Sequence, residues 1–103
     1  MIVGIILYIS SLVCANYGNN TISAINIFTG EYRIISGLNK PKGIVFESNG
    51  NLFCSNDGDN SVVVISPSGE VKEFINKRLN NPSGLIFNES NYLFIANTNS
   101  INP

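Results

Sequence analysis

The chain has 103 residues, of which 44% are apolar and 13% are charged, and its formal net charge is −1. This length suits one small globular unit, and a charge so near zero disfavours a basic surface for nucleic acid or for an anionic membrane. The sequence contains no histidine, which excludes a Ser-His-Asp or Cys-His catalytic set and a zinc site of the usual histidine type.

Residues 1–15 admit two interpretations. An apolar run from Ile2 to Val13 leads into Val13-Cys14-Ala15, which has the form of a secretory cleavage site. No Lys or Arg precedes the run, and its residues have counterparts in a later strand pair, so we favour the start of a repeat and a cytoplasmic location. Cleavage after residue 15 would instead imply secretion. The run is shorter than the roughly 18 to 20 apolar residues that cross a bilayer, so we expect no membrane helix.

The sequence repeats with a period near 40 residues. The segment Pro41–Phe46 (PKGIVF) returns 41 positions later as Pro82–Phe87 (PSGLIF). The segment Leu52–Asn56 (LFCSN) also returns 41 positions later, as Leu93–Asn97 (LFIAN). An earlier copy of Leu52–Asn56 stands 40 positions before it, as Leu12–Asn16 (LVCAN). A fixed period of this length, with short strands in each copy, is typical of a propeller blade.

Apolar runs of strand length recur between turns of Gly, Asn, Ser and Pro, without helical spacing. Asn49-Gly50 suits a tight hairpin, and Pro67 followed by Gly69 suits another turn. In the second copy we therefore predict strands near residues 43–47, 51–55, 61–66 and 71–75.

The predicted fold is all-β: one partial β-propeller of four-stranded antiparallel blades, truncated in the third blade. A closed six-bladed ring of this period needs roughly 240 residues, so the chain supplies about two and a half blades. It is then a fragment of a longer propeller, a module that closes by self-association, or a non-functional gene remnant, and we favour fragment or remnant because the chain stops mid-blade. Open blade faces are sticky, so we expect self-association through them. The blades are expected near residues 4–37, 43–78 and 84–103.

The repeated pattern is Pro-x-Gly-Ile-x-Phe, Gly-Asn-Leu-Phe-x-x-Asn, Asp-Asn-x-Val-x-Val-Ile and Gly-Glu. It resembles the NHL repeat of six-bladed propellers, a superfamily that includes gluconolactonase-like and strictosidine synthase-like proteins. The chain departs from the typical repeat at two places. Asn16, Asn56 and Asn97 stand where the repeat carries Asp, and Thr21 and Ser61 stand where it commonly carries Arg.

Antiparallel blades place the loops between second and third strands on the same rim as the connections between blades. The resemblance implies that ligands approach this rim, and a protein or small-molecule ligand of unknown identity would meet it there. The competing interpretation is a solvated loop face. The predicted rim contains residues 16–20, 56–60 and 97–100 together with Lys40 and Lys42. Our candidate binding residues on it are Lys40, Lys42, Asn56, Asp57, Asp59 and Asn60.

Other repeated positions are expected to be structural. Gly43 and Gly84 lie where a first strand enters the crowded centre of a propeller. Asn16, Asn56 and Asn97 are repeated in the same way, and Asn56 together with Asn60 is expected to bond the backbone of the loop that they bracket.

Two cysteines also occupy equivalent strand positions. Cys14 and Cys54 fall in neighbouring blades, which pack about 10 Å apart, beyond the roughly 4.4 to 6.8 Å between Cα atoms of a disulfide. We predict two free thiols.

We predict no catalytic residue, no metal site and no cofactor. The oxygen-rich segment Asn56–Asn60 lacks the spacing and the distal Glu of an EF-hand loop. The predicted function is an NHL-like binding or scaffold module, without catalysis of its own. The alternative is a fragment of a metal-dependent gluconolactonase-like hydrolase, in which a channel metal such as calcium would polarise a lactone carbonyl or activate water. That alternative needs a channel-facing carboxylate near the start of a first strand, whereas Glu47 and Glu89 lie at the far ends.

Overall fold

The computed structural model describes residues 2–8 and 11–99, with side chains described from residue 11 onward. Within these residues all regular structure is β-strand, because short apolar runs alternate with turn residues throughout. Three stretches that the sequence predictions cover lie outside the described residues: residue 1, residues 9–10 and the predicted end of blade three at residues 100–103. The strands are β1 (Ile2–Tyr8), β2 (Ser11–Asn16), β3 (Thr21–Asn26), β4 (Tyr32–Ile35), β5 (Pro41–Phe46), β6 (Leu52–Asn56), β7 (Ser61–Ile65), β8 (Val71–Ile75), β9 (Pro82–Phe87) and β10 (Leu93–Asn97).

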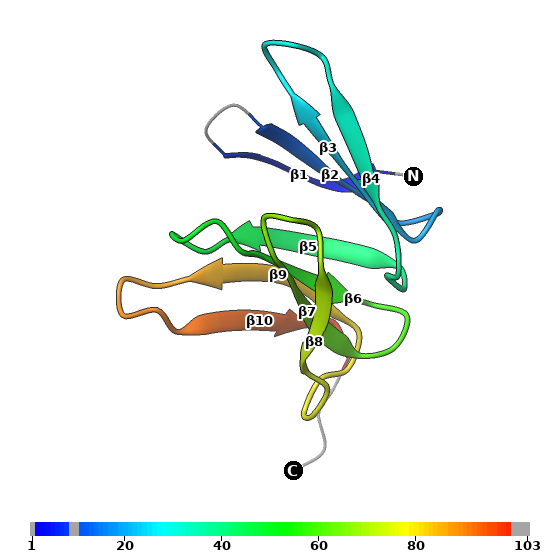
Figure 1. Ribbon diagram of the computed structural model, residues 1–103. Coiled ribbons are helices and arrows are strands. Elements are labelled where there is room, and N and C mark those ends of the chain that lie inside the picture. The colour runs from blue at the N-terminus through cyan, green and yellow to red at the C-terminus, as the bar shows by residue number, and fades with distance from the viewer. Residues whose placement is uncertain (1, 9–10, 100–103) are drawn as a thin grey trace.

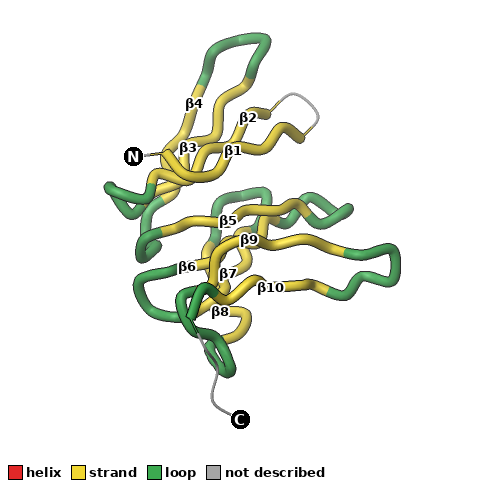
Figure 2. Tube along the Cα trace, turned by 180° about the vertical axis from the view of Figure 1, so that it is seen from behind, coloured by secondary structure: helices red, strands yellow, loops and turns green. Residues whose placement is uncertain are grey.

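The strands form three antiparallel sheets that follow chain order. Blade one contains β1 to β4, blade two contains β5 to β8, and the described part of blade three contains β9 and β10. Figure 1 shows the three sheets stacked one after another, and Figure 2 shows the same order from behind. The first strands lie together, since β5 contacts β1 on one side and β9 on the other. The predicted fold class, a partial propeller of four-stranded blades, is confirmed.

The hairpin turns use the chemistry that the sequence predicts. Gly50 and Gly69 both have a φ of 95°, in the left-handed region that glycine enters without steric cost. The Gly50 amide donates to the carbonyl of Glu47 at 2.9 Å, and the Gly69 amide donates to that of Ser66 at 2.8 Å. These bonds close the first and last turns of blade two.

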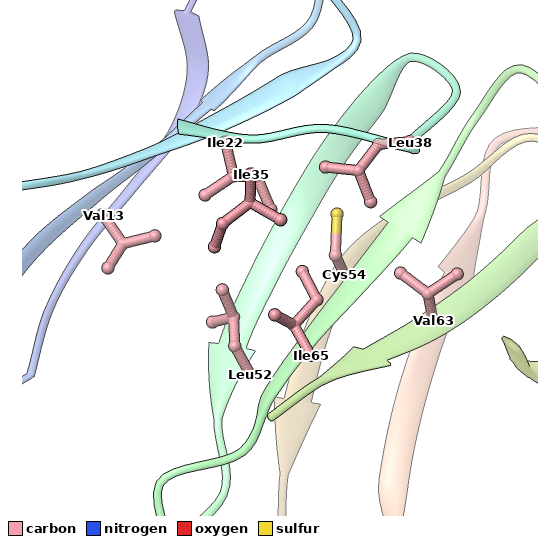
Figure 3. Close-up of a cluster of buried hydrophobic side chains, with 8 residues drawn as sticks. All are labelled: Val13, Ile22, Ile35, Leu38, Leu52, Cys54, Val63 and Ile65. Atoms are coloured by element: carbon pink, nitrogen blue, oxygen red, sulfur yellow. The ribbon is translucent and has the colours of Figure 1, made fainter. Parts of the chain in front are cut away.

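The main core fills the space between blades one and two (Figure 3). Alternation along each strand sends every second side chain to one face of its sheet. Blade two presents Leu52 and Cys54 from β6, and blade one presents Val13 from β2. The full cluster is Val13, Ile22, Ile35, Leu38, Leu52, Cys54, Val63 and Ile65.

The two cysteines form no disulfide. Cys14 and Cys54 are both free and both buried.

Across residues 2–8 and 11–99, the chain forms no helix with the length and hydrophobicity that a membrane crossing requires.

Candidate functional site

The expected rim exists, and backbone hydrogen bonds hold it together. The Asp57 amide donates to the carbonyl of Lys40 at 3.0 Å, and the Gly58 amide donates to that of Asn39 at 3.1 Å. The loop between β6 and β7 is therefore tied to the connection that enters β5. The same two bonds recur 41 positions later, from Thr98 to Asn81 at 3.1 Å and from Asn99 to Asn80 at 3.2 Å.

Two asparagines link each blade to the next one. The side-chain oxygen of Asn20 accepts a bond from the Lys40 amide at 2.8 Å, and that of Asn60 accepts one from the Asn81 amide at 2.7 Å. Both have a positive φ, 59° at Asn20 and 56° at Asn60, which Asn tolerates better than most residues. Each side chain thus satisfies an amide at the start of the following blade.

The side chain of Asn56 makes its hydrogen bonds to its own blade and to the connection that enters it. This buried side chain accepts from the Asn39 amide at 3.3 Å through its oxygen and donates to the Ser61 hydroxyl at 3.5 Å through its nitrogen. Asn97 repeats the first bond, accepting from the Asn80 amide at 2.9 Å. The backbone partner is thus the connection before β5 or β9, so these bonds fix where each first strand begins.

A polar side-chain pair brackets the loop between the second and third strands. Asn16 donates to the Thr21 hydroxyl at 3.2 Å and to the Ser23 hydroxyl at 2.8 Å, and Asn56 donates to the Ser61 hydroxyl at 3.5 Å. A neutral amide-hydroxyl bond therefore spans this loop in blades one and two.

Asp57 joins three blades. Its carboxylate accepts from the Tyr17 hydroxyl of blade one at 3.2 Å and from the Asn81 side-chain nitrogen of the connection into blade three at 3.2 Å. The hydrogen bond to Asp57 raises the pKa of Tyr17, and desolvation and the carboxylate charge add to the rise. Both Asp57 oxygens are thus engaged by neighbouring blades.

The remaining candidates lie nearby with different roles. Asp59 accepts from the Ser61 hydroxyl at 2.6 Å, which closes the loop between β6 and β7. Lys40 has a positive φ of 51° and uses both backbone polar groups at the rim. Lys42 is half-buried within β5, beyond the connection. The rim therefore gathers Lys40, Asn56, Asp57, Asp59 and Asn60, while Lys42 lies on the adjoining strand.

The network includes one residue that the sequence did not place on the rim. Asn81 bonds Asp57 through its side chain and Asn60 through its amide. Tyr17 and Asn20 lie within the predicted rim but were not among the candidate binding residues, although each bonds one of them. Asn20 carried a usable signal, because it stands 40 positions before Asn60 in the repeat.

A second polar contact joins blades two and three near the centre. The Ser55 hydroxyl accepts from the Gly43 amide at 2.7 Å and donates to the Ser83 carbonyl at 2.6 Å. A Cβ on Gly43 would overlap that same carbonyl, so glycine is required for the backbones to approach. At Gly84, the next copy of this position, an added Cβ would meet no atom within 4 Å.

The rim opposite the asparagine network is formed by the turns between first and second strands and between third and fourth strands. It holds a cavity of about 200 Å³ between blades one and two. Its walls include Val13, Leu52 and Ile65, with Arg33 at its polar side. Arg33 donates to the carbonyl of Pro67 at 2.6 Å. This arginine therefore ties blade one to blade two at the rim that lacks the asparagine network.

Within the described ranges, no three His, Cys, Asp or Glu side chains gather closely enough to hold a metal ion. The carboxylates of the rim, Asp57 and Asp59, have instead the hydroxyl and amide partners given above.

Comparison with solved structures identifies the fold. The chain is similar to selenomethionine-substituted virginiamycin B lyase from Staphylococcus aureus, a β-propeller, with a TM-score of 0.86 and 18% identity. The match covers 95% of this chain and 35% of that one, so the chain spans about a third of the lyase. The sequence matches no described protein family and no curated protein. The likeness shows a propeller-type fold.

The asparagine links predict a graded loss of stability. Asn60→Ala should lower the free energy of unfolding by about 2 kcal/mol, because it removes the bond to the Asn81 amide and forces alanine to a positive φ. Asn60→Gly should lower it by only about 1 kcal/mol, because glycine accepts that φ. Urea unfolding of the two variants measures the difference, and equal losses would contradict the role assigned to the backbone angle.

Proposed function

We propose that this chain is a non-catalytic, NHL-like scaffold segment of a β-propeller. In this proposal the rim side chains hold adjacent blades in register. The flat faces of the blades, and not the rim, are the surfaces through which the chain contacts other protein. The observation that carries it is the engagement of Asp57 by Tyr17 on one side and by Asn81 on the other. A carboxylate with both oxygens already bonded between blades serves assembly of the scaffold.

The repeated links support the same proposal. Asn20 and Asn60 each bond the amide that opens the next blade, at 2.8 and 2.7 Å. A ligand that drew these oxygens away from their amides would break the bonds that position β5 and β9. Binding at the rim would therefore compete with the packing of the blades.

The hydrolase alternative makes different demands on the same residues. Metal-assisted opening of a lactone needs carboxylate or amide oxygens that converge on an ion. The virginiamycin B lyase that shares the fold carries an enzyme name, but this chain spans 35% of its length. In the proposed scaffold the oxygens of Asp57 and Asp59 remain with their protein partners, whether or not metal is added.

A calcium titration tests the proposal. The melting temperature of the purified chain should be the same in calcium, in zinc and in a chelator, because an ion that binds only the folded state would raise it by mass action. Lactone hydrolysis should stay at the uncatalysed rate under all three conditions. Two results would reject the scaffold role: a saturable rise in melting temperature with calcium that Asp57→Asn abolishes, or lactone turnover that saturates with metal.

A further inference from the structure

Blade three presents a free face that repeats a face already used in blade two. We define the free face of blade three as Gly84, Ile86, Phe94 and Ala96, which lines a shallow hollow on β9 and β10. Ile86 and Phe94 are opposite one another in the sheet and are 62% and 55% exposed. The matching positions in blade two, 41 residues earlier, are Gly43, Val45, Phe53 and Ser55.

The blade-two positions show what such a face receives. The Phe53 ring contacts the Phe87 ring of blade three edge to face, with centroids 5.3 Å apart. Gly43 admits the Ser83 carbonyl so closely that a Cβ would overlap it. The face therefore seats the first strand of a following blade.

Blade one carries the opposite half of this contact. Val13 and Ile35 point toward blade two, so alternation sends Leu12 and Ile34 to the other side of the sheet. We define the free face of blade one by its two cross-strand rows. These rows are Leu12, Ile25 and Tyr32, and Cys14, Ser23 and Ile34.

The free face of blade one repeats the surface that blade two buries against blade one. In blade two the corresponding row is Leu52, Ile65 and Val71; Leu52 and Ile65 are buried, and Val71 packs against the core. In blade one, by contrast, Tyr32, which stands where blade two has Val71, is 71% exposed. One chain thus presents both halves of the blade-to-blade interface.

We propose that the free face of blade three binds the free face of blade one in a second copy of this chain. The inference builds on the proposed scaffold function, and the two halves of one repeated interface on a single chain identify the occupant. Because the two surfaces differ, the contact is head to tail, which closes into a ring or extends along an axis. The β1 backbone of the second copy would then lie at Gly84 as β9 lies at Gly43.

Two charge substitutions test the proposal by complementation. Tyr32→Lys blocks the face of blade one and Ile86→Lys blocks that of blade three, and both residues are exposed enough to change without loss of fold. Each variant alone should be a monomer by light scattering, with at least tenfold weaker association than wild type. Mixed in equal amounts, the variants should form a dimer and nothing larger, because one intact pair of faces remains between them.

A matched control places lysine on apolar surface elsewhere. Phe28 lies in the turn between β3 and β4 and is 83% exposed, so Phe28→Lys should associate as wild type does. Circular dichroism and melting temperatures verify that all three variants stay folded.

Four results would overturn the proposal. If the wild-type chain is a monomer, then the two faces do not bind a second copy and would instead pack against further blades of a longer polypeptide. Self-association of Tyr32→Lys alone would indicate contact between two copies of blade three. Association of both single variants at wild-type strength would indicate non-specific aggregation, and a mixture that stays monomeric would show that the faces do not fit. All four outcomes are read as mass, independently of the calcium and lactone measurements.

Discussion

Gly43→Ala should lower the free energy of unfolding by about 3 kcal/mol, whereas Gly84→Ala should leave it nearly unchanged. At Gly43 the new methyl group would overlap the Ser83 carbonyl and crowd the Ser55 hydroxyl, 3.1 Å away. Relief of that overlap requires blades two and three to separate, and overpacking of this kind costs about 1 to 3 kcal/mol or more. At Gly84 the methyl group enters open space.

Urea unfolding of the two alanine variants beside wild type measures this difference. The pair is matched, because both glycines occupy the third position of a first strand in the same repeat. The unfolding should be compared at a chain concentration low enough to keep each protein monomeric. Equal destabilisation would show that the glycines are needed for strand geometry and not for the approach of a neighbouring blade.

Alkaline pH should destabilise the fold through Cys54. This thiol is completely buried between blades one and two, and desolvation raises its pKa from 9.0 to about 12, while a backbone hydrogen bond from Lys42 acts weakly in the opposite direction. The unfolded chain releases the proton near pH 9, but the folded chain holds it. The stabilisation is therefore complete below about pH 9 and is lost progressively toward pH 12, at about 1.4 kcal/mol per pH unit.

Cys54→Ala supplies the control for this prediction. All other titratable groups are the same in both proteins, so the difference between wild type and Cys54→Ala isolates the thiol. We expect the wild-type unfolding free energy to fall more steeply between pH 9 and pH 11, by about 3 kcal/mol over that range. Parallel curves would mean that solvent reaches the Cys54 sulfur in the folded state.

The strands and turns were predictable because each of them depends on local residues. The spacing from Pro41 to Pro82 fixed the period, and the alternation of apolar and turn residues located β5 to β8 close to their observed bounds. Gly50 and Gly69 have the positive φ that their turn sequences require. Propensity and periodicity act over a few residues, so one sequence was sufficient for these features.

Contacts between blades were not predictable in the same way. Gly43 and Gly84 share their sequence context, yet one meets the Ser83 carbonyl and the other meets nothing within 4 Å. Asn60 was expected to bond its own loop but bonds the Asn81 amide of the next blade. The partner in each case is set by how the sheets stack, and the identity of a single residue does not encode that.

The amide-hydroxyl pair of blades one and two lies between these two cases. Asn16 with Thr21 and Asn56 with Ser61 recur at a spacing of five residues, and their side chains bond each other. The spacing alone could have indicated the pair, because it brackets a loop between two adjacent antiparallel strands. A pair of polar residues that recurs around the same loop is therefore informative about contacts even without knowledge of the stacking.

In the proposed assembly the same blade-to-blade contact occurs twice: β9 of the same chain lies at Gly43, and β1 of a second copy lies at Gly84. Light scattering of wild type and Gly84→Ala at the same concentration tests this assembly most directly. Wild type should have at least twice the mass of the 11.2 kDa chain. Gly84→Ala should be a monomer, because its methyl group would overlap only a backbone supplied by the second copy. At a concentration that keeps both proteins monomeric, the two melting temperatures should be equal. Equal masses for the two proteins would contradict this assembly.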